Sequence, residues 1–400
     1  QPSNVKAHQN LIELYERANK EKDLEEAISN AKNFVKEKNI IKLYEAVILY
    51  NKDKFSEAIN FLESISFDKN DIKNEIRRVD TLARCYDRIN DNDNAFRYFE
   101  IANSLSPNLM KINRFNKNRY LERIKVRADF FSKPEIKKWK NLKSSKVKSN
   151  PIFLIGFPRS GTTLLDTILR SHPKIEVIEE KTMVEELTNS LKELPQGGLK
   201  DLENISDIQL EKMRKVYMDS LKSNIQNGNN SKIYIDKHPL NMIYAGEIFK
   251  IFPNSKFIFS LRHPCDCVLS CFMQNFVMND AMANFLNLND AAHLYDVVMK
   301  LWSQYISIFK ITHHEVKYEN LVESFEPTVK SVLSFLELPW DNSLLKYTIT
   351  AKKRENIATA SYSQVTKPIY SHADGRWKKY EKQMSNIYPI LEPWIKKFKY

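Results

Sequence analysis

Two patterns of apolar and polar positions divide the chain near residue 150. Up to about residue 130, apolar residues recur every three or four positions, the period of an amphipathic helix, without strand-like alternation. From Pro151 onward, short β-branched and aromatic runs alternate with helical segments, and the clearest runs are residues 152–157, 232–235, 256–261 and 314–318. This alternation is typical of a parallel sheet with crossover helices. We therefore predict helical repeats at 1–132, a basic linker at 133–150 and an α/β domain at 151–400.

The helical region contains a recurring pattern of small and large residues. The best copy is Val79, Leu82, Ala83, Tyr86, Ala95, Phe99, Ala102 and Pro107. Weaker copies hold Ala46, Leu49, Ala58 and Leu62, and then Leu11, Tyr15, Ala27 and Ala31. The pattern resembles the tetratricopeptide repeat, whose length is about 34 residues. Small residues are needed where two antiparallel helices cross closely, and the proline ends the second helix. We predict stacked helical hairpins, which form a concave groove suited to a polypeptide or another extended partner.

Composition and charge narrow the class of protein. Apolar residues make up 42% and charged residues 28% of the chain, which indicates a globular protein. No apolar run approaches the ~20 residues that a membrane-spanning helix needs. The net charge of +12 favours an anionic partner, which leaves nucleic acid, an acidic membrane surface and a phosphorylated ligand open. Residues 133–150 are basic, but Trp139 is their only aromatic residue, so a solvated linker is favoured over a nucleic-acid patch.

Cysteine and glycine are scarce. Three of the four cysteines, Cys265, Cys267 and Cys271, fall at one helix start, with spacing that favours buried thiols over a metal site. The chain has only seven glycines, so each is expected where no other residue fits. Two of them, Gly156 and Gly161, bound a short loop between a predicted strand and a predicted helix.

That loop has the chemistry of an anion site. Backbone N–H groups of a glycine-bounded loop before a helix converge on an anion at the positive end of the helix. The spacing of the two glycines matches the loop of nucleoside triphosphatases, but Thr162 stands where that motif requires lysine. A γ-phosphate and Mg²⁺ site is therefore poorly supported. The alternative is a loop that grips one substituted phosphate through Arg159, Ser160, Gly161, Thr162 and Thr163.

Further charged residues follow later strands. Arg262 ends one strand and Ser270 lies on the next helix, a pair able to hold a second phosphate at the carboxyl edge of a parallel sheet. Lys237 ends another strand and is followed by His238. A lysine there can stabilise negative charge on a departing phosphate oxygen.

These blocks, beginning with FPRSGTTLLDTILRSHP, resemble the sulfotransferases that use 3′-phosphoadenosine 5′-phosphosulfate (PAPS). Within that superfamily the chain is similar to bacterial tetratricopeptide-repeat sulfotransferases and to tyrosylprotein sulfotransferases. The resemblance covers about residues 150–380 and implies the sulfotransferase fold, a P-loop-type parallel sheet with flanking helices.

The resemblance also implies roles for individual residues. The 5′-phosphosulfate would bind the loop at 159–163, and the 3′-phosphate would bind Arg262 and Ser270. Lys237 matches a catalytic lysine, with His238 as a rival base. Glu180 lies at the family's distance past the loop arginine for a general base, with Glu179 as the alternative. The remaining implied contacts are Tyr318 and Ser361, the latter supporting the transferring group, and the cofactor-binding residues Gln364, Lys367 and Arg376.

We therefore predict a PAPS-dependent sulfotransferase that acts without a metal ion on an acceptor hydroxyl, such as a protein tyrosine. Lys181 and Thr182 depart from the tyrosylprotein pattern and put peptide specificity in doubt. Two alternatives stay open, a nucleotide phosphotransferase or hydrolase and a catalytically inactive binding scaffold. We expect no nucleic-acid partner and a cytoplasmic location, and a homodimer stays open.

Overall fold

The computed structural model describes residues 4–17, 20–35, 38–109, 115–142, 150–225, 233–353 and 375–400. The chain forms two compact units, each made of separate stretches. The first unit holds Gln1–Lys117, Phe272–Ala291 and Arg376–Asn386, and the second holds Asn118–Cys271, Ala292–Gly375 and Ile387–Tyr400.

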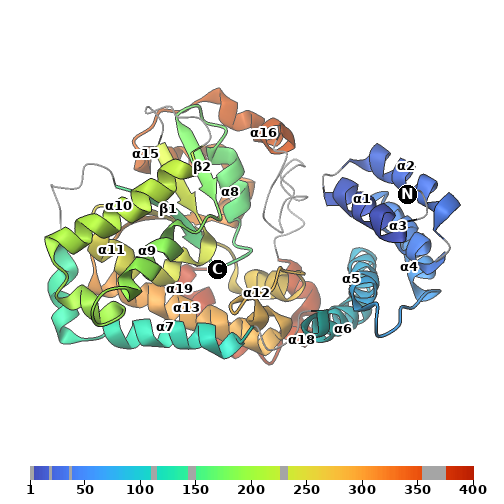
Figure 1. The fold of residues 1–400 in the computed structure, drawn as a ribbon, viewed down its shortest axis with the longest axis horizontal. Helices are drawn as coiled ribbons and strands as arrows, with labels where there is room; N and C mark the ends of the chain where they lie inside the picture. The colour runs from blue at the N-terminus through green and yellow to red at the C-terminus, as the bar shows by residue number, and fades with distance from the viewer. Residues whose placement is uncertain are drawn as a thin grey trace. The chain divides into compact units, whose positions relative to one another are not determined.

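The first unit is helical (Figure 1). Its main helices are α1 (Val5–Arg17), α2 (Glu21–Phe34), α3 (Lys38–Asn51), α4 (Phe55–Glu63), α5 (Ile72–Arg88) and α6 (Asn92–Leu109). The alanines expected at close helix crossings are buried, among them Ala31, Ala46, Ala58, Ala83 and Ala95. Pro107 lies inside the last turn of α6 instead of ending the helix. The helical prediction is confirmed, while the assignment to tetratricopeptide repeats stays a prediction.

Two distant stretches of chain complete the first unit. One contains the 3₁₀ helix η5 (Met282–Leu286), and the other contains η8 (Arg376–Tyr380) and α18 (Glu381–Met384). Phe96 of α6 stacks on Phe272 with ring centroids 5.0 Å apart. The side-chain amide of Asn103 donates to the carbonyl of Phe272 at 2.9 Å. The first unit is therefore not a contiguous N-terminal segment.

The second unit is built on a five-stranded parallel sheet of order β2-β3-β1-β4-β5. Its strands are β1 (Ile152–Gly156), β2 (Ile175–Glu179), β3 (Ile233–Lys237), β4 (Lys256–Leu261) and β5 (Thr312–Lys317). The predicted parallel α/β class is confirmed. Strand β2 was not among the predicted runs, because two glutamates interrupt its apolar residues.

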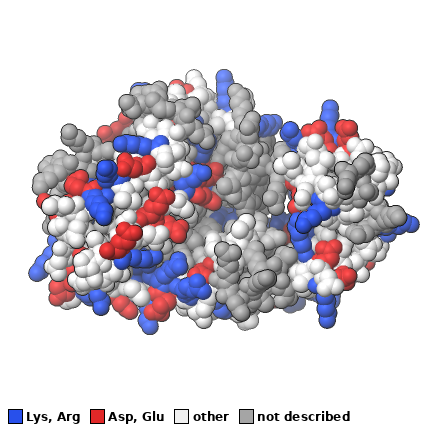
Figure 2. Space-filling view, viewed as in Figure 1, with Lys and Arg blue, Asp and Glu red and all other residues white. Residues whose placement is uncertain are grey.

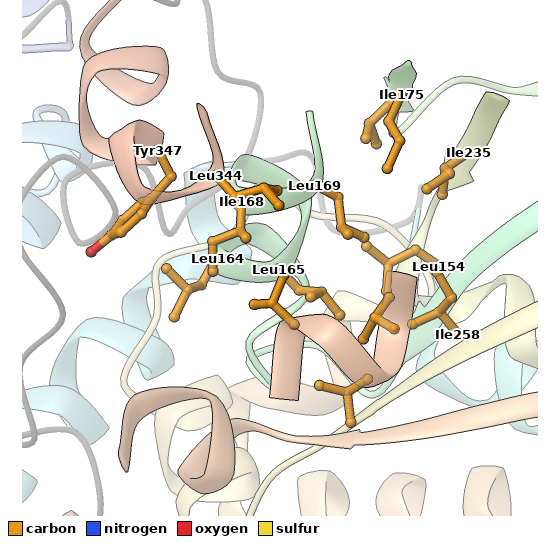
Figure 3. Packing of buried hydrophobic residues seen from close by; sticks show 14 of the residues in the cluster. Leu154, Leu164, Leu165, Ile168, Leu169, Ile175, Ile235, Ile258, Leu344 and Tyr347 are labelled. Carbon is orange, nitrogen blue, oxygen red and sulfur yellow. The ribbon is translucent and has the colours of Figure 1, made fainter. Parts of the chain in front are cut away.

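One face of the sheet is covered by α8 (Thr162–Leu169), α15 (Phe325–Phe335) and α16 (Tyr347–Lys353). Side chains alternate between the faces of a strand, so Leu154, Ile175, Ile235 and Ile258 all point to this side. Figure 3 shows these residues in one buried cluster with Leu165, Ile168 and Leu169 of α8. We call this side the α8 face. By the same alternation, the last residues of β2 and β3 also lie on it.

Aromatic residues dominate the opposite face. Phe153 contacts Tyr217 of α10 (Asp207–Ser223), and Phe259 contacts Trp302 of α13 (Leu288–Ile308) and Phe398 of α19 (Tyr388–Phe398). The other helices of this unit are α7 (Lys117–Phe131), α9 (Met183–Lys192), α11 (Ala245–Ile251), α12 (Pro264–Phe272) and α14 (Tyr318–Glu323), and the 3₁₀ helices are η2 (Pro134–Asn141), η3 (Leu199–Glu203), η4 (Pro239–Tyr244) and η6 (Asn342–Lys346).

The stretch expected to be a solvated linker contains helix η2. Its Ile136 is fully buried, and Trp139 packs against Phe131 and Phe309. The first half of the 133–150 stretch therefore contributes to the core of the second unit. The apolar side chains of Ile136 and Trp139 explain this difference, because their burial outweighs the polar character of the lysines between them.

Candidate active site

The predicted site residues gather at the carboxyl edge of the sheet. Four strands end at or directly before one of them: β2 at Glu179, β3 at Lys237, β4 before Arg262 and β5 before Tyr318. The glycine-bounded loop follows β1 at the centre of the sheet. Ligands of open α/β sheets bind at this edge, where the strand order reverses. In the order observed here, that reversal lies between β1 and β4.

Two glycines shape the loop for different reasons. A β-carbon on Gly156 would lie 2.5 Å from the carbonyl oxygen of Ser260 and 2.6 Å from Oγ of Ser160. Gly161, which precedes the first residue of α8, has φ +95°. Arg159 is also left-handed, with φ +70°. Alternation of left- and right-handed residues turns successive N–H groups toward one point, which forms an anion-binding nest.

The loop hydroxyls are buried. Ser160, Thr162 and Thr163 expose at most 5% of their surface. Oγ of Ser160 has no hydrogen-bond partner among the described residues. A buried hydroxyl without a partner is costly, and an anion in the loop would satisfy it.

The two predicted phosphate-binding arginines contact the same loop. Nε of Arg159 donates to Oγ of Ser270 at 2.9 Å, and Nη1 of Arg262 donates to the carbonyl of Arg159 at 3.2 Å. The guanidinium of Arg262 lies over the ring of Tyr318, 5.0 Å from its centroid. Burial lowers the pKa of Arg262, but Asp266 and other neighbouring groups raise it above its ordinary value. The structure therefore brings Arg159, Arg262, Ser270 and Tyr318 together, with Arg262 fully charged.

Lys237 lies between two carboxylates. It is fully buried, and its Nζ donates to Oε1 of Glu180 at 2.8 Å and to Oε1 of Glu179 at 3.2 Å. The backbone N–H of Glu180 also donates to the carbonyl of Lys237 at 2.8 Å. The predicted catalytic lysine and both candidate bases thus form one contiguous group on the α8 face.

The surroundings of His238 shift its pKa. Burial lowers its pKa, and the nearby carboxylate of Glu180 only partly opposes this shift. Its Nδ1 is buried without a hydrogen-bond partner among the described residues. A neutral imidazole beside the lysine remains an alternative base.

Two buried ionic groups near the site had not been predicted. On the opposite face, Asp236 accepts a hydrogen bond from Tyr217 at 3.1 Å, and burial raises the pKa of Asp236 to about 7. At the end of α8, Nε of the following residue, Arg170, donates to Oδ1 of Asp166 at 2.6 Å. The four-residue spacing of Asp166 and Arg170 on one helix was a signal that could have found the second pair.

The predicted residues of the C-terminal block have different outcomes. Ser361, Gln364 and Lys367 lie outside the described residues. Arg376 lies in the first unit, where its Nη2 is 2.8 Å from Oδ2 of Asp87. The hydroxyl of Tyr380 donates to the same carboxylate at 2.7 Å. The cofactor role of Arg376 stays a prediction, and the structure adds a structural role within the helical unit.

The cysteines are free and buried, and burial raises the pKa of Cys265 to about 12. Among the residues that the structure describes, no group of three or more His, Cys, Asp or Glu side chains is placed to hold a metal ion. On the face shown in Figure 2, acidic and basic side chains are interspersed over both units.

Residues 151–342 match the model of the Sulfotransferase family. This range contains the loop, Glu179, Glu180, Lys237, Arg262, Ser270 and Tyr318.

Curated relatives match part of this chain. A protein of Aquifex aeolicus described as uncharacterized is 30% identical over 259 residues, which cover 62% of this chain and 33% of that protein. The protein-tyrosine sulfotransferase of Drosophila melanogaster is 25% identical over 244 residues, which cover 56% of this chain and 46% of that enzyme. This chain therefore spans less than half the length of either relative.

Among solved structures, the sulfotransferase domain of the Synechococcus PCC 7002 olefin synthase is 20% identical. It aligns with 59% of this chain and 91% of its own, with a TM-score of 0.39. Within the described ranges, no helix combines the length and apolar character needed to cross a membrane.

Proposed function

We propose that this protein moves a sulfonate group from PAPS to an acceptor hydroxyl. The observation on which the proposal rests is the arrangement at the sheet edge, where a lysine held by two glutamates lies beside a lysine-free anion loop. The match of residues 151–342 to the Sulfotransferase family model supports sulfonate transfer as the reaction.

The loop suits a donor with a single substituted phosphate. Gly156 leaves room for backbone approach, and the buried hydroxyl of Ser160 lacks a partner among the described residues. Arg159 and the N–H groups at the start of α8 supply positive charge for the 5′-phosphosulfate. Arg262 and Ser270 would hold the 3′-phosphate, and Tyr318 would contact the nucleotide.

The donor supplies an activated sulfonate when it is bound, and the chain's residues would then assist the transfer. The carboxylate of Glu180 takes the proton of the acceptor hydroxyl as the hydroxyl oxygen forms its bond to sulfur. The ammonium of Lys237 stabilises the electron pair left on the phosphate oxygen when the old sulfur–oxygen bond breaks. Ser361 would support the transferring group. Fixed cations and N–H donors perform the charge stabilisation that Mg²⁺ provides in kinases.

The acceptor is a hydroxyl of a class still to be assigned. Similarity to protein-tyrosine sulfotransferases makes a tyrosine-containing peptide the first acceptor to assay. The helical hairpins would hold an extended acceptor of this kind.

Calorimetry with 3′-phosphoadenosine 5′-phosphate (PAP), compared with ATP and Mg²⁺, tests the donor. We expect PAP to bind and ATP to bind more weakly, and preference for ATP with Mg²⁺ turnover would support a phosphotransferase instead. Arg159→Ala and Arg262→Ala should lose PAP binding. Glu180→Ala should keep PAP binding but lose transfer of labelled sulfonate from PAPS, and full activity in this variant would exclude Glu180 as the base.

A further inference from the structure

We propose that Glu179 is a positioning residue that anchors the ammonium of Lys237, which leaves Glu180 as the proton acceptor. The inference rests on the proposed sulfonate transfer and divides the two adjacent glutamates between two tasks. It follows from three observations, namely strand register, hydrogen-bond geometry and the charges behind Glu179.

Strand register fixes Glu179 beside Lys237. Both are the last residues of neighbouring parallel strands, and they are direct register partners. Both side chains lie on the α8 face. Glu179 exposes 10% of its side chain and Lys237 none. A buried ammonium needs a permanent counter-ion, and the strand register keeps the backbone of Glu179 directly beside that of Lys237.

Glu180 is held differently. It lies one residue beyond the strand with φ +49°, a left-handed conformation that is uncommon for a residue with a side chain. Its side chain is 31% exposed, about three times as much as that of Glu179. The left-handed turn moves this carboxylate off the strand and gives it access to solvent. An acceptor hydroxyl therefore has a route to Glu180 that it lacks to Glu179.

The hydrogen bonds of Lys237 agree with this division. An ammonium has three N–H donors. The bonds to Glu179 and Glu180 use two of them. Among the described residues these are the only hydrogen bonds of the ammonium, so one donor remains for the departing phosphate oxygen. When Glu180 takes up the acceptor proton, Glu179 remains as the negatively charged partner of the Lys237 ammonium.

Further charges lie around the group. Arg170, which directly follows α8, pairs with the fully buried Asp166 of that helix, and the negative charge of Glu179 contributes to the electrostatic environment of Arg170. The ring of His238 interacts electrostatically with Glu185 of α9 as well as with Glu180 and Lys237. The charges alternate in sign through Asp166, Arg170, Glu179, Lys237 and Glu180.

The test compares Glu179→Gln with Glu180→Gln, and Glu176→Gln is the matched control on the same strand. Glu176 is the register partner of Tyr234 and has no hydrogen bond to Lys237. PAP affinity is measured by calorimetry, and kcat is measured with PAPS and an acceptor peptide. PAP reports on the position of Lys237 in the absence of the acceptor.

We expect opposite patterns in the two variants. Glu179→Gln should bind PAP more weakly than the wild type, because Lys237 has lost its buried counter-ion, and kcat should fall about 100-fold through misplacement of the ammonium. Glu180→Gln should show a smaller change in PAP binding and a larger loss of kcat, about 10³-fold or more. Glu176→Gln should match the wild type in both.

A wild-type PAP binding curve in Glu179→Gln would overturn the inference. So would an active Glu180→Gln beside an inactive Glu179→Gln, since the roles would then be exchanged. If Glu179→Gln does not fold, Glu179→Asp keeps the charge but withdraws the carboxylate, and wild-type kcat in that variant would also overturn it. If the wild type binds PAP but transfers no sulfonate, the proposed function fails. The PAP binding curves of the Glu179 variants would still test whether Glu179 positions Lys237.

Discussion

The ring of Tyr318 lies against the α-carbon of Gly161. A β-carbon at this position would be 2.7 Å from Cδ2 of Tyr318, well inside contact distance. Tyr318 directly follows strand β5, and Gly161 directly precedes helix α8. This contact therefore joins the anion loop to the carboxyl end of β5. The loop and the ring beneath Arg262 therefore depend on one another.

Gly161→Ala should disrupt the loop and reduce PAP binding at least 100-fold. The variant combines a steric clash with a left-handed backbone, which alone costs about 1–2 kcal/mol. Gly197→Ala is the control, because Gly197 has φ +74° but its nearest neighbour to a β-carbon is 3.8 Å away. It should lose only the backbone contribution in thermal unfolding and keep PAP binding. Equal PAP affinity in the two variants would show that the Tyr318 contact is unimportant.

Ser270→Ala should weaken PAP binding about tenfold or more. Its hydroxyl accepts from the charged Nε of Arg159, and such a bond is worth about 1.5–3 kcal/mol. Titration calorimetry checks the affinity. Ser303→Ala provides a matched control, because Oγ of Ser303 on α13 accepts from Nζ of Lys397 on α19 at 2.6 Å and has no predicted phosphate-binding residue as its partner. Unchanged affinity in Ser270→Ala would remove this serine from the phosphate site.

Asp236 should make stability depend on pH. Burial raises the pKa of Asp236 to about 7, whereas an unfolded aspartate titrates near 3.9. The folded state therefore binds the proton more tightly than the unfolded state. Protonation of Asp236 contributes on the order of 4 kcal/mol to the free energy of unfolding at low pH, and this contribution is lost as pH rises from about 4 to 7.

Asp236→Asn should remove that loss and raise stability above pH 7, because the amide oxygen can still accept from Tyr217. Denaturant unfolding at acidic and alkaline pH measures the difference. Asp219→Asn on the exposed side of α10 is the control and should leave the pH dependence unchanged. A wild-type pH dependence in Asp236→Asn would contradict the argument.

Asp87→Asn should destabilise the first unit by about 2 kcal/mol. Asp87 accepts from both Arg376 and Tyr380, and its side chain is 14% exposed. Asp93→Asn is the control, since Asp93 pairs with Lys382 but is 74% exposed and should contribute about 0.5 kcal/mol or less.

The same pair separates two roles of Arg376. If Arg376 binds the nucleotide, Arg376→Ala should lose PAP affinity beyond any loss in Asp87→Asn. Equal PAP affinity in the two variants would leave Arg376 with its structural role alone.

Local chemistry made the sheet edge predictable. The glycine-bounded loop, Lys237 and Arg262 each follow an apolar strand, and parallel strands place their carboxyl ends at one edge. Glu179 could not be assigned from sequence alone, because its role depends on the register of β2 with β3, which is a tertiary property. Strand β2 itself has too few consecutive apolar residues to be recognised in isolation.

Tertiary packing also explains positions that the sequence left unassigned. Gly246 had no evident reason to lie in a helix. The structure shows that a β-carbon there would be 2.5 Å from Phe131 and 2.6 Å from Tyr305. Likewise, the partner of Arg376 is 289 residues away in the sequence, so no local pattern could identify it.

That long separation bears on how the protein is made. The hairpin helices leave the ribosome before the sheet, and the stretches 272–291 and 376–386 that complete their unit are synthesised later. Asp87 must therefore wait while a further 289 residues are synthesised before Arg376 reaches it. No single cut in the polypeptide separates the two units, so the first unit reaches its final stability only after the sheet-forming residues have also been synthesised.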